Sequence, residues 1–161
     1  MLKILAKISG AKEVEREVSA ISKRSSNPTN VFKFIMQDFA NYETEVFSSG
    51  GAVHGLRMWP KLKPETVRKK GHSLILLHDN HLVNSLTNPS DPNFEFRIIN
   101  KKTMEIGTSV PYANILKKGI KGRMAKRNPI RIAPIKRKAW GAMFLRFIKD
   151  GKTDHQQIRI S

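Results

Sequence analysis

Large apolar side chains recur every three to four residues between residues 30 and 48, which is the spacing of one face of a helix. Thr29 or Asn30 can cap this helix after a break at residues 25–28. An aromatic stripe at helical spacing is more often core than ligand site, so we expect the rest of the chain to pack on it. The stripe consists of Phe32, Ile35, Phe39, Tyr42 and Val46, with Met36 and Phe47 beside it.

A second amphipathic helix is predicted before this one, over residues 11–25. Ala11, Val14, Val18 and Ile21 fall on one of its faces, and charged side chains occupy the others. Because only a short break separates the two helices, the sequence predicts a helical hairpin.

The hydrophobic period changes to two over residues 94–108, which indicates strands. Residues 100–102 can form the turn of an antiparallel hairpin. The segment 140–149 is compatible with a helix or a strand. The strong turn signal at Asp150-Gly151 favours a second hairpin, which would pair 140–149 with 154–160.

Short helices are expected between the stripe and the C-terminal third. One starts at Pro64 and ends before a left-handed cap at Gly71. A second runs from a cap at Asp79 through Leu86, and a third covers residues 112–116 and ends near Gly119.

These elements predict a single α+β domain over residues 1–161, with a helical part at 11–48 and an α+β part at 55–161. The N-terminal helical pair is expected to pack on a small antiparallel sheet, and a long basic loop at 117–138 to project from the domain. No cysteine is present, and no apolar run is long enough to span a bilayer.

Positive charge is concentrated in one segment. The chain carries 30 Lys+Arg against 13 Asp+Glu, for a net charge of +17, yet residues 1–50 are nearly neutral. A block of like charges repels itself unless a polyanion or an acidic surface lies against it, although a solvated loop with no partner is also compatible with the pattern. Within 117–138, which has no acidic residue, the basic residues are Lys117, Lys118, Lys121, Arg123, Lys126, Arg127, Arg131, Lys136, Arg137 and Lys138.

Histidines near Asp79 raise the question of a metal or acid–base site. His78 lies just outside the helix that Asp79 is expected to cap, and His81 lies in its first turn, so the two need not converge on one ion. The chain lacks a second acidic cluster of the kind that completes a divalent-metal nuclease site. We therefore predict no catalytic residues, no cofactor and no metal, with His54 and His72 included in that interpretation.

Short motifs follow one another in order over residues 59–119. They consist of Trp59, Leu62 and Thr66, then Leu77, Asp79, Leu82 and Ser85, then Ile106, Gly107 and Thr108, and last Tyr112, Ala113 and Gly119. This series resembles the phage virion morphogenesis family, whose members are tail completion or head–tail joining proteins. The family has a Trp and Leu stretch ending in Thr, then Leu-x-Asp-Thr-Gly-x-Leu-x-x-Ser, then an Ile-Gly-Thr strand, then a Tyr-Ala helix ending in Gly. His81 departs from this pattern, since the family has a glycine there. The segment 132–139 looks similar to the basic Ile-x-Pro-x-Lys-Lys-Ala segment that follows in many relatives.

The resemblance implies a structural virion protein, assembled in the host cytoplasm, that forms a ring of six copies at the head–tail junction. Its partners would be a head-closure or portal-side connector and a tail terminator or tail tube protein, with non-specific contact to genomic DNA and none to membrane. The motif residues would hold the fold, and the basic residues would face a partner or DNA. The alternative is a nucleic-acid-binding protein without enzymatic activity, whose basic arm is its whole function. No helix-turn-helix signature supports that alternative, and only Trp140 stands close to the basic run.

Overall fold

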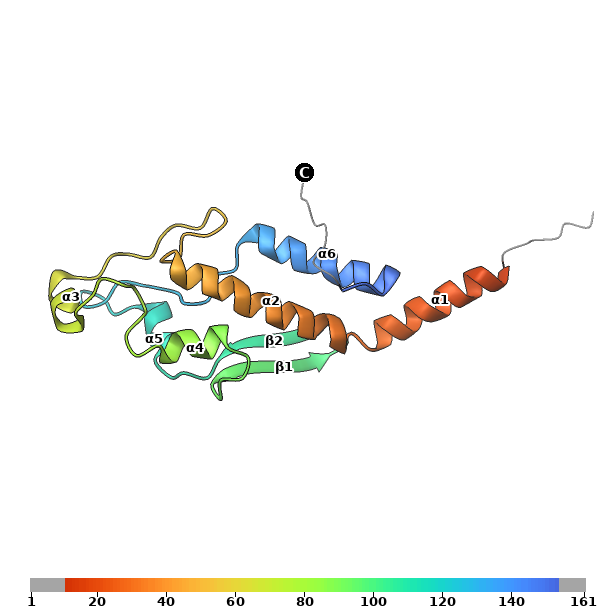
Figure 1. Ribbon diagram of the computed structural model, residues 1–161, viewed down its shortest axis with the longest axis horizontal. Helices are drawn as coiled ribbons and strands as arrows, with labels where there is room; N and C mark the ends of the chain where they lie inside the picture. The colour runs from red at the N-terminus through yellow and green to blue at the C-terminus, as the bar shows by residue number, and fades with distance from the viewer. Residues whose placement is uncertain (1–10, 154–161) are drawn as a thin grey trace, which may run out of the picture.

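A computed structural model describes residues 11–153 of the chain. This part of the chain is elongated (Figure 1). The second helix is its longest element and lies in the middle of the molecule. Two helices come first and a small antiparallel sheet follows, so the predicted α+β class is confirmed. The elements are α1 (Ala11–Ser26), α2 (Thr29–Ser48), α3 (Pro64–Lys70), α4 (His81–Thr87), β1 (Phe94–Asn100), β2 (Thr103–Thr108), α5 (Ala113–Lys118) and α6 (Pro134–Asp150).

Helix α2 carries the core, as its apolar stripe predicts. All five stripe residues are buried, and Phe39, Tyr42 and Val46 have no exposed surface. The helix contacts α4 and β1 on one side and α6 on another. Removing one such side chain from water stabilises the folded state by roughly 1.5–3 kcal/mol. The remaining elements are therefore held mainly by what they bury on α2.

The predicted hairpin at 94–108 is confirmed. β1 and β2 pair antiparallel from Phe94 opposite Thr108 to Asn100 opposite Thr103, with an irregularity between Ile98 and Asn100. The Asn100 side chain closes the turn by accepting a hydrogen bond from the backbone N–H of Lys102 at 2.8 Å. Phe94 then packs edge-on against Phe39, which joins the sheet to α2.

The second hairpin is a wrong prediction. Residues 140–149 belong to α6, which begins with Pro134 in its first turn and ends at a left-handed Gly151 (φ 72°). The run from 142 to 149 has no clean period, and burial decides: Trp140, Met143 and Phe147 lie on one helical face and are buried. The proposed partner strand, 154–160, lies outside the described residues.

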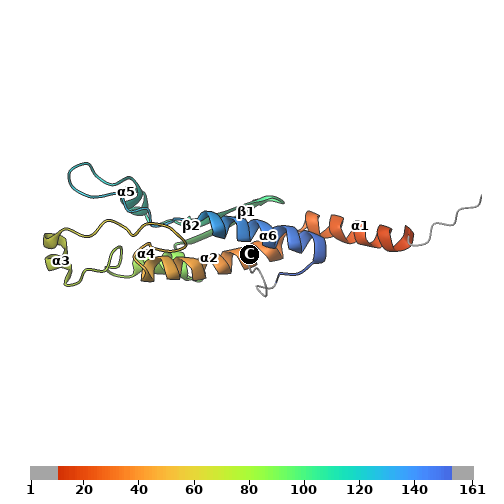
Figure 2. The same ribbon diagram turned by 90° about the horizontal axis from the view of Figure 1, so that it is seen from above.

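The helical hairpin is also wrong. Instead of folding back along α2, α1 continues past the N-terminal end of α2 and projects from the molecule (Figures 1 and 2). Its C-terminal end is held on α6, where the Arg24 Nε atom donates to the Ile148 carbonyl oxygen at 2.8 Å and the same guanidinium bonds the Lys149 carbonyl. Those carbonyls lack partners within the last turn of α6, so a guanidinium satisfies them well.

A polar cluster fixes α6 on α2. The Asp38 Oδ2 atom accepts a hydrogen bond from Trp140 Nε1 at 2.6 Å and lies 2.7 Å from Lys136 Nζ. Asp38 and Trp140 are both buried, so each charge or dipole in the cluster is matched.

The burial of Glu43 makes the stability of the fold depend on pH. Its carboxylate oxygens are buried without a hydrogen-bond partner in the described structure, and burial raises the pKa of Glu43 from 4.5 to about 8. The folded state therefore holds a proton that the unfolded chain releases above its ordinary pKa. The contribution of Glu43 to stability is greatest below pH 4.5 and is lost as the pH rises toward about 8.

We expect the free energy of unfolding to fall between those pH values by up to about 1.4 kcal/mol per unit from this group. Urea unfolding across the range measures it. Glu43→Gln should flatten the slope, whereas Glu95→Gln, a matched change at an exposed carboxyl, should leave it in place. An unchanged slope in Glu43→Gln would contradict this account.

Candidate assembly surface

Trp59 fastens two distant loops to the core. Its indole is 2 % exposed and meets the Phe47 ring edge-on at 5.5 Å. The Nε1 atom donates to the Asn128 carbonyl oxygen at 2.9 Å, and the Trp59 backbone N–H donates to the Gly50 carbonyl at 2.8 Å. The loop before α3 and the segment after α5 are thereby held side by side.

Two other motif residues, Ser85 and Thr108, meet in space. The Ser85 Oγ atom of α4 and the Thr108 Oγ1 atom of β2 are 2.7 Å apart, and Ser85 has no exposed surface. Leu82 is buried one turn earlier on α4. Gly107 is also buried, and a Cβ atom there would lie 3.7 Å from Ile130 Cδ1, which is ordinary contact. No bulge forms at Gly107, since the sheet irregularity lies at Ile98 and Asn100.

The prediction that Asp79 caps α4 is wrong by one residue. Asn80, not Asp79, occupies the cap position, with a left-handed φ of 59° that asparagine tolerates better than most residues. Asp79 accepts a hydrogen bond at Oδ1 from the His81 backbone N–H at 3.2 Å, and this bond holds the pKa of Asp79 below its usual value. The positive φ therefore sits at Asn80, next to the position where the resembled family has glycine.

The histidines do not form a site in the described part of the chain. His54 stacks on Tyr42, His81 contacts the Asn93 side chain, and one ring nitrogen of His72 is buried without a partner. No group of three or more His, Asp or Glu side chains there is close enough to hold a metal ion.

An open groove of about 940 Å³ lies between α3, α4, α5 and the turn after α5. Motif residues Leu62, Thr66, Asp79, Leu82 and Tyr112 all contribute to its walls. Tyr112 is 38 % exposed there, and Ala113 behind it is half-buried. The apolar part of the lining includes Leu62, Leu76, Leu82, Leu116, Ile120 and Met124, and the basic part is Lys61, Lys63, Lys69, Lys70, Arg123 and Arg127.

Positive charge is crowded around this groove. Only Glu65 and Asp79 oppose the six basic side chains in its lining. Arg127 is buried and donates to the carbonyl oxygens of Pro60 at 2.8 Å and Lys61 at 2.7 Å, and burial lowers the pKa of Arg127. Burial and the nearby Arg127 guanidinium also lower the pKa of Lys70. An acidic group placed in the groove would relieve this repulsion.

The basic segment 117–138 divides into two sets. Three of its side chains are used inside the fold: Arg127 as above, Arg131 on the Arg57 carbonyl at 2.6 Å, and Lys136 on Asp38. Its ends belong to α5 and α6, and the part between is mostly irregular. The remaining members are exposed, namely Lys117, Lys118, Lys121, Arg123, Lys126, Arg137 and Lys138.

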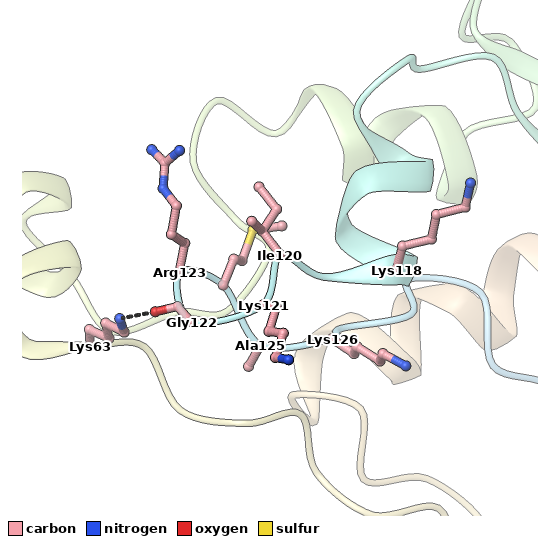
Figure 3. Close-up of a pocket in the computed structure, with 9 residues that line it drawn as sticks. Lys63, Lys118, Ile120, Lys121, Gly122, Arg123, Ala125 and Lys126 are labelled. Atoms are coloured by element: carbon pink, nitrogen blue, oxygen red, sulfur yellow. Dashed lines mark hydrogen bonds between the residues drawn. The ribbon is translucent and has the colours of Figure 1, made fainter.

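Side chains of the turn after α5 point to two different sides. It is closed by a bridge between Ile120 and Met124, and Lys63 Nζ contacts the Gly122 carbonyl oxygen at 3.4 Å. Ile120 and Arg123 point to one side of the turn, and Lys121 points to the other (Figure 3). Ile120 and Arg123 line the large groove, whereas Lys121 does not.

Sequence reasoning missed the groove and its Lys61, Lys63, Lys69 and Lys70 side chains. These residues lie outside the conspicuous block at 117–138, and no local pattern shows that the two segments face each other. The missing signal is the long-range contact made by Arg127, which a basic residue in a charged run does not reveal.

Comparison with family models, with curated proteins and with solved structures found no match to this chain. Within residues 11–153, no helix has the length and apolar character required to cross a membrane.

The turn offers a matched test of its own geometry. Gly119 and Gly122 both have positive φ (69° and 73°), but a Cβ at Gly119 would lie 2.8 Å from the Met124 carbonyl oxygen while one at Gly122 meets nothing. We expect Gly119→Ala to destabilise the chain by about 1–3 kcal/mol more than Gly122→Ala in urea unfolding. Equal effects of the two changes would contradict the close packing of this turn.

Proposed function

We propose that this chain is a structural protein of the phage head–tail junction, a tail completion or connector protein that forms a ring joining the DNA-filled head to the tail. Its partners in this proposal are further copies in a six-membered ring, a head-closure or portal-side protein, and a tail terminator or tube protein. Its place is the assembled virion.

The observation that carries the proposal is that residues of the motif series have structural roles in the fold. Trp59, Leu82, Ser85, Thr108 and Gly119 all serve packing, hydrogen bonding or turn geometry in one frame. This structural use of the motif residues agrees with what the resemblance implies, namely that they hold the fold.

Surface charge supports the same proposal. Five exposed basic side chains of 117–138 and the basic groove lie toward the end of the elongated molecule that carries α3 and α5, whereas Arg137 and Lys138 lie on α6. The five are Lys117, Lys118, Lys121, Arg123 and Lys126. A ring component that surrounds DNA, or that meets an acidic neighbouring ring, has a use for unpaired positive charge without base-specific contacts.

Electron microscopy of a phage that lacks this gene tests the proposal. We expect separate DNA-filled heads and tails in the lysate, because the junction cannot form. Tails of normal length would favour completion over length termination. Intact infectious particles would overturn the proposal.

A nucleic-acid-binding protein is the second candidate, favoured by the lysines that point away from the groove, such as Lys121. Fluorescence anisotropy of the full chain with duplex DNA at two salt concentrations separates the two. A junction protein should bind weakly, with no sequence preference and a steep loss of affinity with salt. Changing Lys117, Lys118, Lys121 and Lys126 to Gln should lower the log–log salt slope by about 0.9 for each phosphate that the variant no longer neutralises. Tight binding at low salt that is lost steeply as the salt concentration rises would favour the second candidate, because its basic arm binds by neutralising phosphates.

A further inference from the structure

Helix α1 presents an apolar stripe that nothing in the described structure covers. Val14 is 61 % exposed, Val18 60 % and Ile21 38 %. These residues are spaced three or four apart, so they form one continuous stripe of roughly two helical turns. Only the C-terminal end of α1 is anchored, through Arg24 on α6. The stripe therefore lies on a helix that projects from the molecule and is anchored at its C-terminal end.

The stripe has acidic borders. At 3.6 residues per turn, Glu13 and Glu17 fall along one edge of it and Glu15 along the other. Basic side chains, such as Arg16, fall on the opposite face of the helix. All three glutamates are exposed, and none takes part in an ion pair within residues 11–153. This is unusual in a chain whose net charge is +17.

The groove described above has the complementary character. Its wall combines apolar residues such as Leu116 and Ile120 with a basic rim that includes Lys69 and Arg123. Its volume of about 940 Å³ suits roughly two turns of a helix about 10 Å across. An apolar helix face laid in a hydrophobic groove, with charges matched along the rim, is a common mode of recognition.

The α1 helix and the groove of one copy lie at opposite ends of the molecule (Figures 1 and 2). A helix cannot reach its own groove in this fold, so the occupant must come from another molecule. Because the two surfaces differ, the contact is head-to-tail and repeats from copy to copy, which closes into a ring when the rotation between copies allows.

We propose that α1 of one copy docks by its Val14–Val18–Ile21 stripe in the basic-rimmed groove of a second copy of this chain. Glu13, Glu15 and Glu17 then face the basic rim of the groove. Because these side chains are negatively charged, α1 does not suit binding to DNA. The proposal deepens the proposed function and rests on it for the ring, since it names the contact between neighbouring subunits. A single helix in a groove is a small interface, so free copies should associate weakly and the closed assembly should be the stable form.

Engineered cysteines test this directly, because the natural chain has none. The full chain carrying Val18→Cys and Ile120→Cys should give a ladder of disulfide-linked oligomers under mild oxidation, since each copy offers both halves of the contact. Both positions are exposed, so neither change should unfold the chain. Val18→Cys with Lys121→Cys is the matched control, because Lys121 points to the other side of the turn and should give no ladder.

Surface substitutions then measure the affinity by sedimentation. Val18→Lys should weaken association about tenfold, as expected for removal of one buried valine, whereas Ser19→Lys on the polar face should not. Arg123→Glu should also weaken it, and combining that change with Glu17→Lys should recover part of the affinity.

Absence of the ladder with the Val18–Ile120 pair would overturn the proposal. So would a dominant dimer from Val18→Cys alone, which would show that α1 helices pair with each other. The proposed function fails or stands separately. A ladder together with intact virions in the phage lacking the gene keeps the docking contact and removes the junction role, whereas no ladder with separated heads and tails does the reverse.

Discussion

The buried hydroxyl of Tyr42 determines the path of the C-terminal third of the chain. This oxygen donates to the Arg131 carbonyl at 2.8 Å and accepts from the Ala133 backbone N–H at 3.0 Å, from a side chain with no exposed surface. The two bonds satisfy backbone groups where the chain enters α6. Asp38, one turn earlier on α2, then holds Trp140 and Lys136. Since α1 rests on α6 through Arg24, the placement of α1 also depends on this face of α2.

The C-terminal end of α2 organises the groove. Phe47 packs on Trp59, and Trp59 holds the segment at Asn128 beside the loop that leads to α3. One central helix thus places two different surfaces at the two ends of an elongated chain: an acid-bordered apolar helix and a basic-rimmed apolar groove. A modest apolar content of 39 % is enough for this arrangement, because the core is a narrow layer along α2.

The sequence predicted those elements whose signal is local. The α2 stripe repeats over five positions, the period of 94–108 has one interpretation, and Gly71 adopts the expected left-handed cap with φ 80°. The α6 error arose because an apolar run such as 142–149 has no period of its own, and burial of Trp140 and Phe147 on α2's side of the molecule decides its form. The end of α1 is held on α6 by the hydrogen bonds of Arg24, a long-range contact that no local pattern in residues 11–28 reveals. The groove joins segments about fifty residues apart, so only the fold shows that Lys69 and Arg123 share a rim.

Hydrogen–deuterium exchange of the full chain at low and high protein concentration tests most directly whether α1 of one copy binds in the groove of another copy. The account predicts that amides of residues 12–21 in α1 and of residues 116–127 beside the groove gain protection together as concentration rises. The hairpin turn at 100–102, which is exposed and lies in neither surface, should not change. Protection of α1 alone, or no change at either end, would contradict the account.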